Sequence, residues 1–444
     1  MFSEAKERQY LSGDALYQLI RSHFRAVADT RPAATVAIPL HDALMAGYAV
    51  FALKMPSLLA FDDQRRNDEA NLRSLFGLQH VPCDTQMRTI LDDVDPQQLR
   101  PAFTDIFRQL QRGKALEPFV FFQGHYLMAL DGTTYHSSEK VHCPYCLEKK
   151  SRNGKITYSH QMLGAALVHP DLREVIALCP EPIIKQDGDT KNDCERNASR
   201  RFFGHFRREH PKLPVVVVAD ALSANAPMIA DLREHDLHFI LGIKPGSHGY
   251  LFEQMRTASE TGQAHVLTLV DADGTLHHYR WLEKASLNES NAEVLVTMLE
   301  YWEIPPKGSK KPLRHFSWVT DLTVREDTAP QLVRGGRARW HIENETFNTL
   351  KNQGYYFDHN FGHGAKNLSV VFALLMMLAF LVDQTMQLCD VLFQAALKQV
   401  GRKCRFWEAI RALFLHFHLT SMRQAYELLR SKYKATPPSA ADSS

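Results

Sequence analysis

Apolar residues change their spacing along the chain, which divides it into regions with different predicted structure. From residue 1 to about residue 115, apolar positions recur at helical spacing in HDALMAGYAVFALKM, in NLRSLFGLQHVPCDTQMRTILDDV and in LRPAFTDIFRQLQRG. No alternating strand pattern interrupts these segments. The pattern predicts a helical N-terminal region over residues 1–115.

Two short segments of this region are candidates for a helix-turn-helix. NLRSLFG and CDTQMRTIL are separated by the break QHVP, and Asp84 is expected to cap the second helix. Such a motif would place one helix against DNA. Helix pairs with short turns also occur in ordinary bundles, so both interpretations stay open.

Strand signals prevail over residues 116–249. FVFFQGHYLMALDGTTY, ITYSHQMLGAALVHP and EVIALCPEPII predict three strands, and Asn192 or Asp193 can cap the helix NDCERNASRRFFGHFRREH that follows. The runs LPVVVVAD and LHFILGIKPG are apolar on both faces, as in strands buried within a sheet, and the segment APMIADLREH between them is helical. This order predicts an α/β core.

Residues 250–325 favour shorter strands that alternate in polarity. HVLTLVDADGTLHHYRWL contains an Asp-Gly hairpin signal, and AEVLVTMLEYWEI and SWVTDLTV follow as further strands. We interpret this region as a β-rich insertion. The helical segment APQLVRGGRARWHIENETFNTLK comes next, and residues 326–366 are expected to complete the core with this helix and a loop.

The last region, residues 367–444, is predicted to be helical. Its most apolar run, Leu368 to Val382, has fifteen residues. A helix needs about 20 apolar residues to cross a bilayer. We therefore expect a buried helix here and no membrane among the partners of the protein.

Charge and cysteine content narrow the function classes. The net charge is only +2, which excludes a wholly basic nucleic-acid coat, but KKSRNGK, ASRRFFGHFRREH, KGSKKPLR and VGRKCR form local basic patches compatible with DNA. The seven cysteines are odd in number and lack disulfide-like spacing. This pattern favours the reducing cytoplasm of a cell over secretion.

Three acidic residues stand at informative places. Asp131 is expected to end the strand YLMAL and Asp220 to end VVVVA, and ligands of open α/β sheets bind outside the carboxyl ends of strands. Glu343 lies on a predicted helix with Arg339, Phe347 and Lys351 along the same face. Single aspartates are also common turn formers, and such a helix can simply be an exposed ladder of ion pairs.

These pieces resemble a DDE transposase of a bacterial insertion sequence. LDGTTY matches the segment of the first aspartate, VVVVAD that of the second, and RWHIE…F…LK that of the glutamate helix, in this order and with a β-rich insertion before the last. The resemblance covers roughly residues 80–365. It implies an α/β fold with an RNase H-like mixed sheet flanked by helices, and DNA cleavage and strand transfer at the ends of a mobile element.

The resemblance also implies site residues and a cofactor. Asp131, Asp220 and Glu343 would be catalytic and would hold two Mg²⁺ or Mn²⁺ ions, because hard divalent ions prefer oxygen ligands and a pair of them stabilises phosphodiester cleavage. Glu345 would instead point toward solvent or a partner. Arg339 and Lys351 would hold phosphate.

The match to the tyrosine, arginine, glutamate and lysine signature of such families is partial. Arg339 and Glu343 keep the expected spacing, whereas Gly336 stands at the tyrosine position and Lys351 lies one residue farther from the glutamate. Arg334, Arg337 and Trp340 are further candidate DNA contacts. Trp340, Ile342 and Leu350 are expected to anchor the helix to the core.

The partners that follow are the terminal repeats of the element, target DNA and a second copy of the chain in a homodimer on DNA. Two alternatives stay open. One is a transposase-derived DNA-binding protein without transposition activity, and the other is a stand-alone nuclease of the same fold.

A second constellation is HCPYC, which contains Cys143 and Cys146. This spacing fits structural zinc, a redox pair or two unrelated core cysteines. Candidate additional zinc ligands are His136, His142, His160, Cys179 and Cys194. The segment DHNFGHG, residues 358–364, is expected to form a loop near the active site whose histidines contact DNA and bind no metal.

Overall fold

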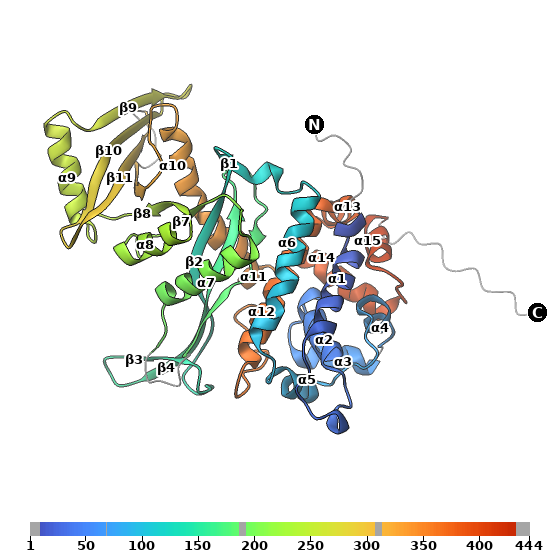
Figure 1. Ribbon diagram of the computed structural model, residues 1–444. Helices are drawn as coiled ribbons and strands as arrows, with labels where there is room; N and C mark the ends of the chain where they lie inside the picture. The colour runs from blue at the N-terminus through green and yellow to red at the C-terminus, as the bar shows by residue number, and fades with distance from the viewer. Residues whose placement is uncertain (1–8, 68, 186–191, 307–312, 432–444) are drawn as a thin grey trace, which may run out of the picture.

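One mixed sheet runs through the protein and is the frame on which the candidate site is built (Figure 1). The computed structural model describes residues 9–67, 69–185, 192–306 and 313–431, and among these residues twelve strands join the sheet in the order β3-β4-β2-β7-β8-β12-β11-β10-β9, with β1 on β2 and with β5 and β6 on β4. The strands are β1 Val120–Phe122, β2 His125–Ser138, β3 Leu147–Lys150, β4 Ile156–Val168, β5 Ile176–Ala177, β6 Glu181–Ile183, β7 Val215–Ala219, β8 His238–Gly242, β9 His265–Val270, β10 Leu276–Asn288, β11 Asn291–Ile304 and β12 Arg314–Thr320.

The centre of the sheet is parallel. Strand β7 pairs in parallel with β2 on one side and with β8 on the other, and all its residues are buried. Residues apolar on both faces are what a strand covered by helices on both sides requires. The α/β, RNase H-like fold expected from the sequence is therefore confirmed.

The strands of residues 250–325 extend this same sheet. Strand β12 pairs antiparallel with β8 and then with β11, so β9 to β11 form the far end of the sheet in Figure 1. The region also contains the helix α9, Gly249–Glu260, which the strand interpretation missed. The basic segment KGSKKP, residues 307–312, lies outside the described residues.

Helices from the two ends of the chain pack together. The N-terminal helices are α1 Gly13–Ala26, α2 Leu40–Ala52, α3 Leu58–Asn67, α4 Ala70–Phe76, α5 Asp84–Leu91 and α6 Arg100–Arg112, with short 3₁₀ turns at Gln9–Leu11, Ala33–Thr35, Pro96–Leu99 and Glu117–Phe119. The C-terminal helices are α12 Leu368–Cys389, α13 Val391–Val400, α14 Lys403–His416 and α15 Met422–Arg430. Helix α2 contacts α12 and α1 contacts α15, so the blue and red helices of Figure 1 lie side by side.

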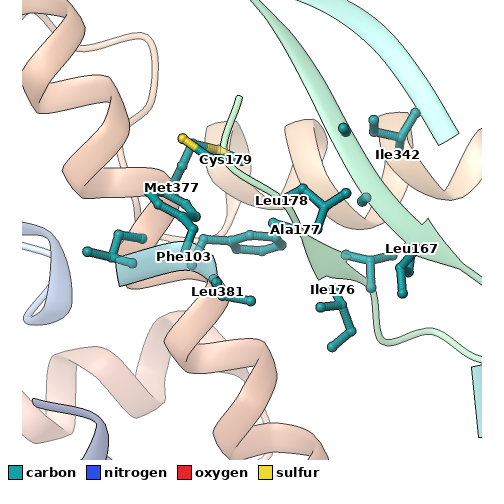
Figure 2. Close-up of a cluster of buried hydrophobic side chains, with 14 of the residues drawn as sticks. Phe103, Leu167, Ile176, Ala177, Leu178, Cys179, Ile342, Met377 and Leu381 are labelled. Atoms are coloured by element: carbon teal, nitrogen blue, oxygen red, sulfur yellow. The ribbon is translucent and has the colours of Figure 1, made fainter. Parts of the chain in front are cut away.

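Helix α12 is the apolar run that the sequence predicted to be buried. It is long and apolar enough to cross a membrane by composition alone, but 94% of its most apolar window is buried inside the protein. Figure 2 shows why: Met377 and Leu381 of α12 meet Phe103 of α6 and the strand segment Ile176 to Cys179. We conclude that α12 is a core helix.

A buried ion pair joins the N-terminal helices to the C-terminal helices. Lys54 Nζ lies 2.5 Å from a carboxylate oxygen of Asp383 on α12, and the Tyr355 hydroxyl donates to the same carboxylate. The Lys54 ammonium also lies 3.7 Å from the ring centroid of Trp407 on α14. Removing one partner of such a pair typically costs about 3–5 kcal/mol, because the other charge stays buried. The two terminal regions are thus held as one helical body.

Two expected helix caps differ from the structure. Helix α5 begins at Asp84 and its N-cap is Cys83, because Gln86 accepts from the Cys83 backbone amide. Helix α7, Glu195–Glu209, follows Cys194 at the N-cap position, and neither Asn192 nor Asp193 caps it. Asp193 instead accepts from Arg201, at 2.7 Å. Helix α5 thus begins one residue earlier than a cap at Asp84 implies, and α7 begins later than a cap at Asn192 or Asp193 implies.

The segments of the candidate helix-turn-helix are α4 and α5. Helix α4 is locked to the C-terminal helices, because the buried Asn71 amide donates to the carbonyls of Phe414 and Phe417. Helix α5 exposes Gln86 and Arg88. The pair is thus built into the helical body, and DNA binding by α5 stays a prediction.

Candidate active site

Asp131 and Asp220 lie level with each other on neighbouring strands. The parallel ladder pairs Tyr126 with Val215 and ends with Ala129 paired with Val218, so the same register carried two residues further brings 131 beside 220. Asp220 follows the last residue of β7, as expected, and its carboxylate accepts from the Leu222 backbone amide at 3.0 Å.

Asp131 does not end its strand, contrary to the sequence prediction. Strand β2 continues to Ser138 because β4 pairs with it along this whole length, with Asp131 opposite Gly164. Strand β7 stops at Ala219, however, so beyond that point one edge of β2 has no parallel neighbour. Asp131 therefore sits where the sheet opens, although its own strand goes on.

The glutamate segment is not the continuous α-helix that the sequence predicted. Helix α10, Ala329–Ala338, is followed by a π-helical turn, η5 Ile342–Phe347, and then by the short α11, Asn348–Asn352. Glu343 lies within the π-helical turn. Such turns are uncommon and occur often at functional sites.

Packing fixes this turn on the sheet. Ile342 and Leu350 are fully buried, as predicted, and Ile342 belongs to the apolar cluster that includes Leu167 of β4 (Figure 2). The Phe347 ring lies against Gly164, where an added Cβ would come within 2.6 Å of it. Because Gly164 pairs with Asp131, this contact sets the turn directly over the Asp131 face of the hairpin.

Arg339 joins two of the acidic residues. Its Nη1 atom lies 2.7 Å from a carboxylate oxygen of Glu343 and 3.5 Å from one of Asp131. The side chain of Arg339 is only 15% exposed, so this contact is shielded from solvent more than a surface pair would be. The expected neighbours Arg339 and Glu343 thus meet Asp131 in space.

Glu195 is a fourth acid that the sequence analysis missed. It is the first residue of α7, and its carboxylate covers Gly132, where an added Cβ would come within 2.1 Å of the Oε1 atom. Successive strand residues face opposite sides, so Glu195 approaches from the side of the sheet opposite to Glu343. Both reach the open edge of β2 beyond the end of β7.

Neighbouring carboxylates affect Asp131 and Glu195 electrostatically. Burial raises the pKa of Asp131 to about 7; the Arg339 guanidinium acts against this rise, and the carboxylates of Glu343, Glu195 and Asp220 add to it. Burial, followed by the charge of Asp220, also raises the pKa of Glu195. Burial and neighbouring negative charge thus both favour the protonated forms of Asp131 and Glu195.

The acids border a cleft of about 510 Å³. It is lined by Leu130, Asp131, Gln161, Leu163, Asp193, Cys194, Glu195, Arg196, Ser199, Asp220, Leu222, Ser223, Asn225 and Met228. Most polar groups come from the N-terminal end of α7 and from the segment after β7. The cleft can admit an extended substrate to Asp131, Asp220 and Glu195 from outside.

The tyrosine position of the family signature is closed by packing. An added Cβ at Gly336 would lie 2.5 Å from the indole nitrogen of Trp318 on β12, and one at Gly335 would lie 3.0 Å from Phe121. These two glycines let α10 lie close to the sheet. A tyrosine at 336 would require Trp318 to move, which explains this departure from the signature.

The other candidate DNA contacts lie along the same segment. Arg337 pairs with Glu303, Arg334 pairs with Asp171, and Lys351 lies 3.6 Å from Asp358. Trp340 is 54% exposed, so it does not anchor the helix as the sequence analysis expected. An exposed tryptophan beside Arg339 is available to a ligand. The role of all four side chains in DNA binding stays a prediction.

The HCPYC segment belongs to a second cluster, away from the acids. Cys143, Cys146, His160 and His363 are all buried, and their ligand atoms lie within 4.8 Å of one another; no other such group occurs among the described residues. The cluster can hold a metal ion. His363 lies in the DHNFGHG loop, which the sequence analysis expected to bind no metal, and its ring joins this cluster.

The remaining candidate ligands fall elsewhere. The His136 ring packs beside His363 but its Nε2 atom lies 3.2 Å from the carbonyl of Val141, and His142 stacks on Tyr158. Cys179 is buried beside α12 (Figure 2). Cys194 is exposed at the N-terminus of α7. Of the predicted ligands, His160 alone joins the two cysteines.

Comparison with known proteins identifies the family of the chain. No curated protein matches the sequence. A family model described as a transposase DDE domain matches residues 123–381, which begin just before β2 and end within α12. The match spans Asp131, Asp220 and Glu343 and covers more than half of the chain. The protein therefore belongs to the transposase DDE domain family.

Proposed function

We propose that this protein is the transposase of a bacterial insertion sequence, which cleaves DNA at the ends of the element and joins them to a target. The observation that carries the proposal is the meeting of Asp131, Asp220 and Glu343 at the open edge of β2. Asp131 and Asp220 line the same cleft, and Arg339 joins Asp131 to Glu343 of the distant helical turn.

The donor set fits hard divalent cations. The acidic side chains around Asp131 offer oxygen ligands, which Mg²⁺ and Mn²⁺ prefer. Burial raises the pKa of Asp131, the neighbouring carboxylates raise it further, and a bound cation would oppose both effects. Asp131, centrally placed, would bind both ions, while Asp220 and Glu343 would each bind one. When bound, the two ions would stabilise the charge on the attacking and leaving oxygens of the phosphodiester.

Arg339 would serve two purposes. In the absence of metal, its guanidinium offsets part of the charge of Asp131 and Glu343. Once cations take over this task, Arg339 is free to turn toward a DNA phosphate, for which its planar fork is suited. Trp340 beside it offers an exposed aromatic face to an unpaired base.

Metal-dependent cleavage is the direct test. The full-length protein should cut duplexes that carry the inverted repeats flanking its gene when Mg²⁺ is present, and should be inactive after EDTA treatment until Mg²⁺ or Mn²⁺ is restored. Cleaved ends and joined products are resolved on sequencing gels, with a duplex of scrambled ends as the control. Cleavage that persists in EDTA would reject the assignment of the acids.

The same assay separates the alternatives. A transposase-derived binding protein would retain end binding without cleavage, and a stand-alone nuclease would cleave without joining ends to a target. A homodimer on DNA would appear as a complex with two chains and two ends. In a bacterial cytoplasm the nucleoid supplies both the element and the target DNA.

Glu195 offers a second, more moderate prediction. Glu195→Gln removes one charge beside Asp131 and Asp220 while the side chain can still cover Gly132. We expect cleavage to fall about 10- to 100-fold, as for residues that support metal ligands, and more Mg²⁺ to be needed for half-maximal rate. Titration of the cleavage rate with Mg²⁺ measures both effects.

Glu234→Gln is a matched control, because Glu234 is an exposed glutamate at the end of α8, Ala226–Glu234. It should leave the rate and the Mg²⁺ requirement unchanged. If Glu195→Gln behaves like this control, Glu195 is a structural neighbour without a part in metal binding.

A further inference from the structure

We propose that Cys143, Cys146, His160 and His363 form a structural zinc site that fastens the segment after the catalytic glutamate to the β2–β4 hairpin. The site lies apart from the acidic cluster, and transposition chemistry does not require it. Its four ligands come from three places: the turn between β2 and β3, strand β4, and the loop between α11 and α12.

The distances suit a tetrahedral ion. The two sulfur atoms lie 3.9 Å apart, close to the separation of about 3.8 Å that zinc–sulfur bonds of about 2.3 Å produce at a tetrahedral angle. The Nε2 atom of His160 lies 3.3 Å from the sulfur of Cys143, and that of His363 lies 3.2 Å from the sulfur of Cys146. The Nε2 atom of each histidine therefore lies close to the two sulfurs, beside the position that the ion would occupy.

Burial distinguishes this cluster from two ordinary core cysteines. All four residues are buried, and the Nδ1 atoms of both His160 and His363 have no hydrogen-bond partner. Burying two imidazoles whose only polar contacts are with sulfur is costly. A metal bond at each Nε2 atom would offset that cost, and a buried pair of thiols has no need of two imidazoles.

The identity of the ion follows from the ligand types. Thiolate and imidazole ligands in a closed tetrahedral set are typical of structural zinc, whereas Mg²⁺ takes oxygen ligands. The two metal sites of the protein would therefore not compete for the same ion. With all four positions filled by protein, no position is left for a substrate.

The position of the site gives it a structural role. On β4, His160 lies four residues before Gly164, the residue against which Phe347 packs. Both residues of β4 face partners on β2: His160 pairs with His136, and Gly164 pairs with Asp131. Phe357, between α11 and His363, packs near Tyr135 of β2. Zinc at His363 would thus hold the end of the segment that begins with Glu343.

Metal content tests the site without reference to DNA cleavage. The full-length protein, purified without added metal, should contain about one zinc ion per chain when measured by inductively coupled plasma mass spectrometry. Exchange with Co²⁺ should give the visible absorption of a tetrahedral cobalt–thiolate centre. A wild-type protein that neither contains zinc nor gives this absorption would overturn the proposal, whatever its activity on DNA.

Variants of the loop test the ligand set. His363→Ala should lose the zinc, His363→Cys should keep it because sulfur can replace the ring nitrogen, and His359→Ala should keep it because His359 is exposed in the same loop. Loss of zinc should also speed trypsin cleavage at the exposed Lys366. Zinc retained in His363→Ala, or equal cleavage at Lys366 with and without zinc, would contradict the proposed fastening.

Discussion

Asp131→Asn is expected to abolish DNA cleavage, with a loss of more than about 10³-fold, while leaving the binding of end DNA nearly unchanged. Asparagine has the same shape but cannot supply the negative charge that two cations would share at this position. Asp131 is also buried among other carboxylates, which raises its pKa to about 7. Neutralising it should therefore leave the melting temperature equal or higher. Cleavage, gel-shift and thermal unfolding assays measure the three outcomes.

The combination of lost cleavage and retained stability is the informative result. Asp220→Asn should behave in the same way, because Asp220 lies level with Asp131 on the neighbouring strand. Asp236→Asn is the matched control: Asp236 is exposed, has a positive φ that asparagine tolerates, and lies outside the cleft. Cleavage at near wild-type rate by Asp131→Asn would remove Asp131 from the chemistry.

Much of the sheet was predictable because its centre has a simple pattern. Strand β7 is a run of β-branched residues, which is typical of a strand buried on both faces. The polar Asp220 directly after this run marks the end of the strand at Ala219 in the sequence. The position of Asp131 within β2 was harder to predict. Asp131 and Gly132 have the composition of a turn, but pairing with the long strand β4 carries β2 on to Ser138.

The sequence did not predict which residues are brought together only by tertiary packing. Glu195 carries no local signal other than being an acid in the first turn of a helix, where acids are common. Its relation to Gly132 depends on how α7 lies on the sheet. A clue was present in Gly132 itself, since a glycine beside a candidate catalytic residue often marks a close approach of another group.

The cluster of cysteines and histidines shows the same limit. The spacing of Cys143 and Cys146 indicated half of a site, and His160 was among the candidates for the rest. His363 was missed because it lies more than two hundred residues along the chain, in a loop rich in glycine and histidine that suggested a DNA contact. Strand pairing and the path of the chain after α11 bring it to the cysteines.

The glutamate segment was predicted as a helix, but its geometry was not. A change from α-helical to π-helical turns leaves little trace in the spacing of apolar residues, and Ile342, Phe347 and Leu350 satisfy either pattern. What fixes the turn is the Phe347 ring against Gly164. Which glutamate faces Asp131 therefore has to be argued from contacts.

Those contacts separate Glu343 from Glu345. Glu343 shares the Arg339 guanidinium with Asp131, and it adds to the raised pKa of Asp131. Glu345 acts on other groups: burial lowers the pKa of His341 and of Lys403 at the start of α14, and the charge of Glu345 acts against this lowering. Glu345 therefore interacts electrostatically with groups outside the acidic cluster, and the expectation that it points to solvent or a partner stays a prediction.

Glu343→Gln is therefore expected to reduce cleavage by more than about 10³-fold, whereas Glu345→Gln should stay within about threefold of the wild-type rate. The first substitution removes a charge that would hold a cation beside Asp131, and the second removes only a half-exposed charge near Lys403. Both rates are measured on intact and pre-nicked end DNA at equal occupancy. Pre-nicked DNA isolates joining from the first cut, so a true metal ligand should fail on both substrates. If Glu345→Gln is the inactive variant, the third ligand lies two residues further along the π-helical turn. Arg339 would then pair with a glutamate, Glu343, that binds no metal.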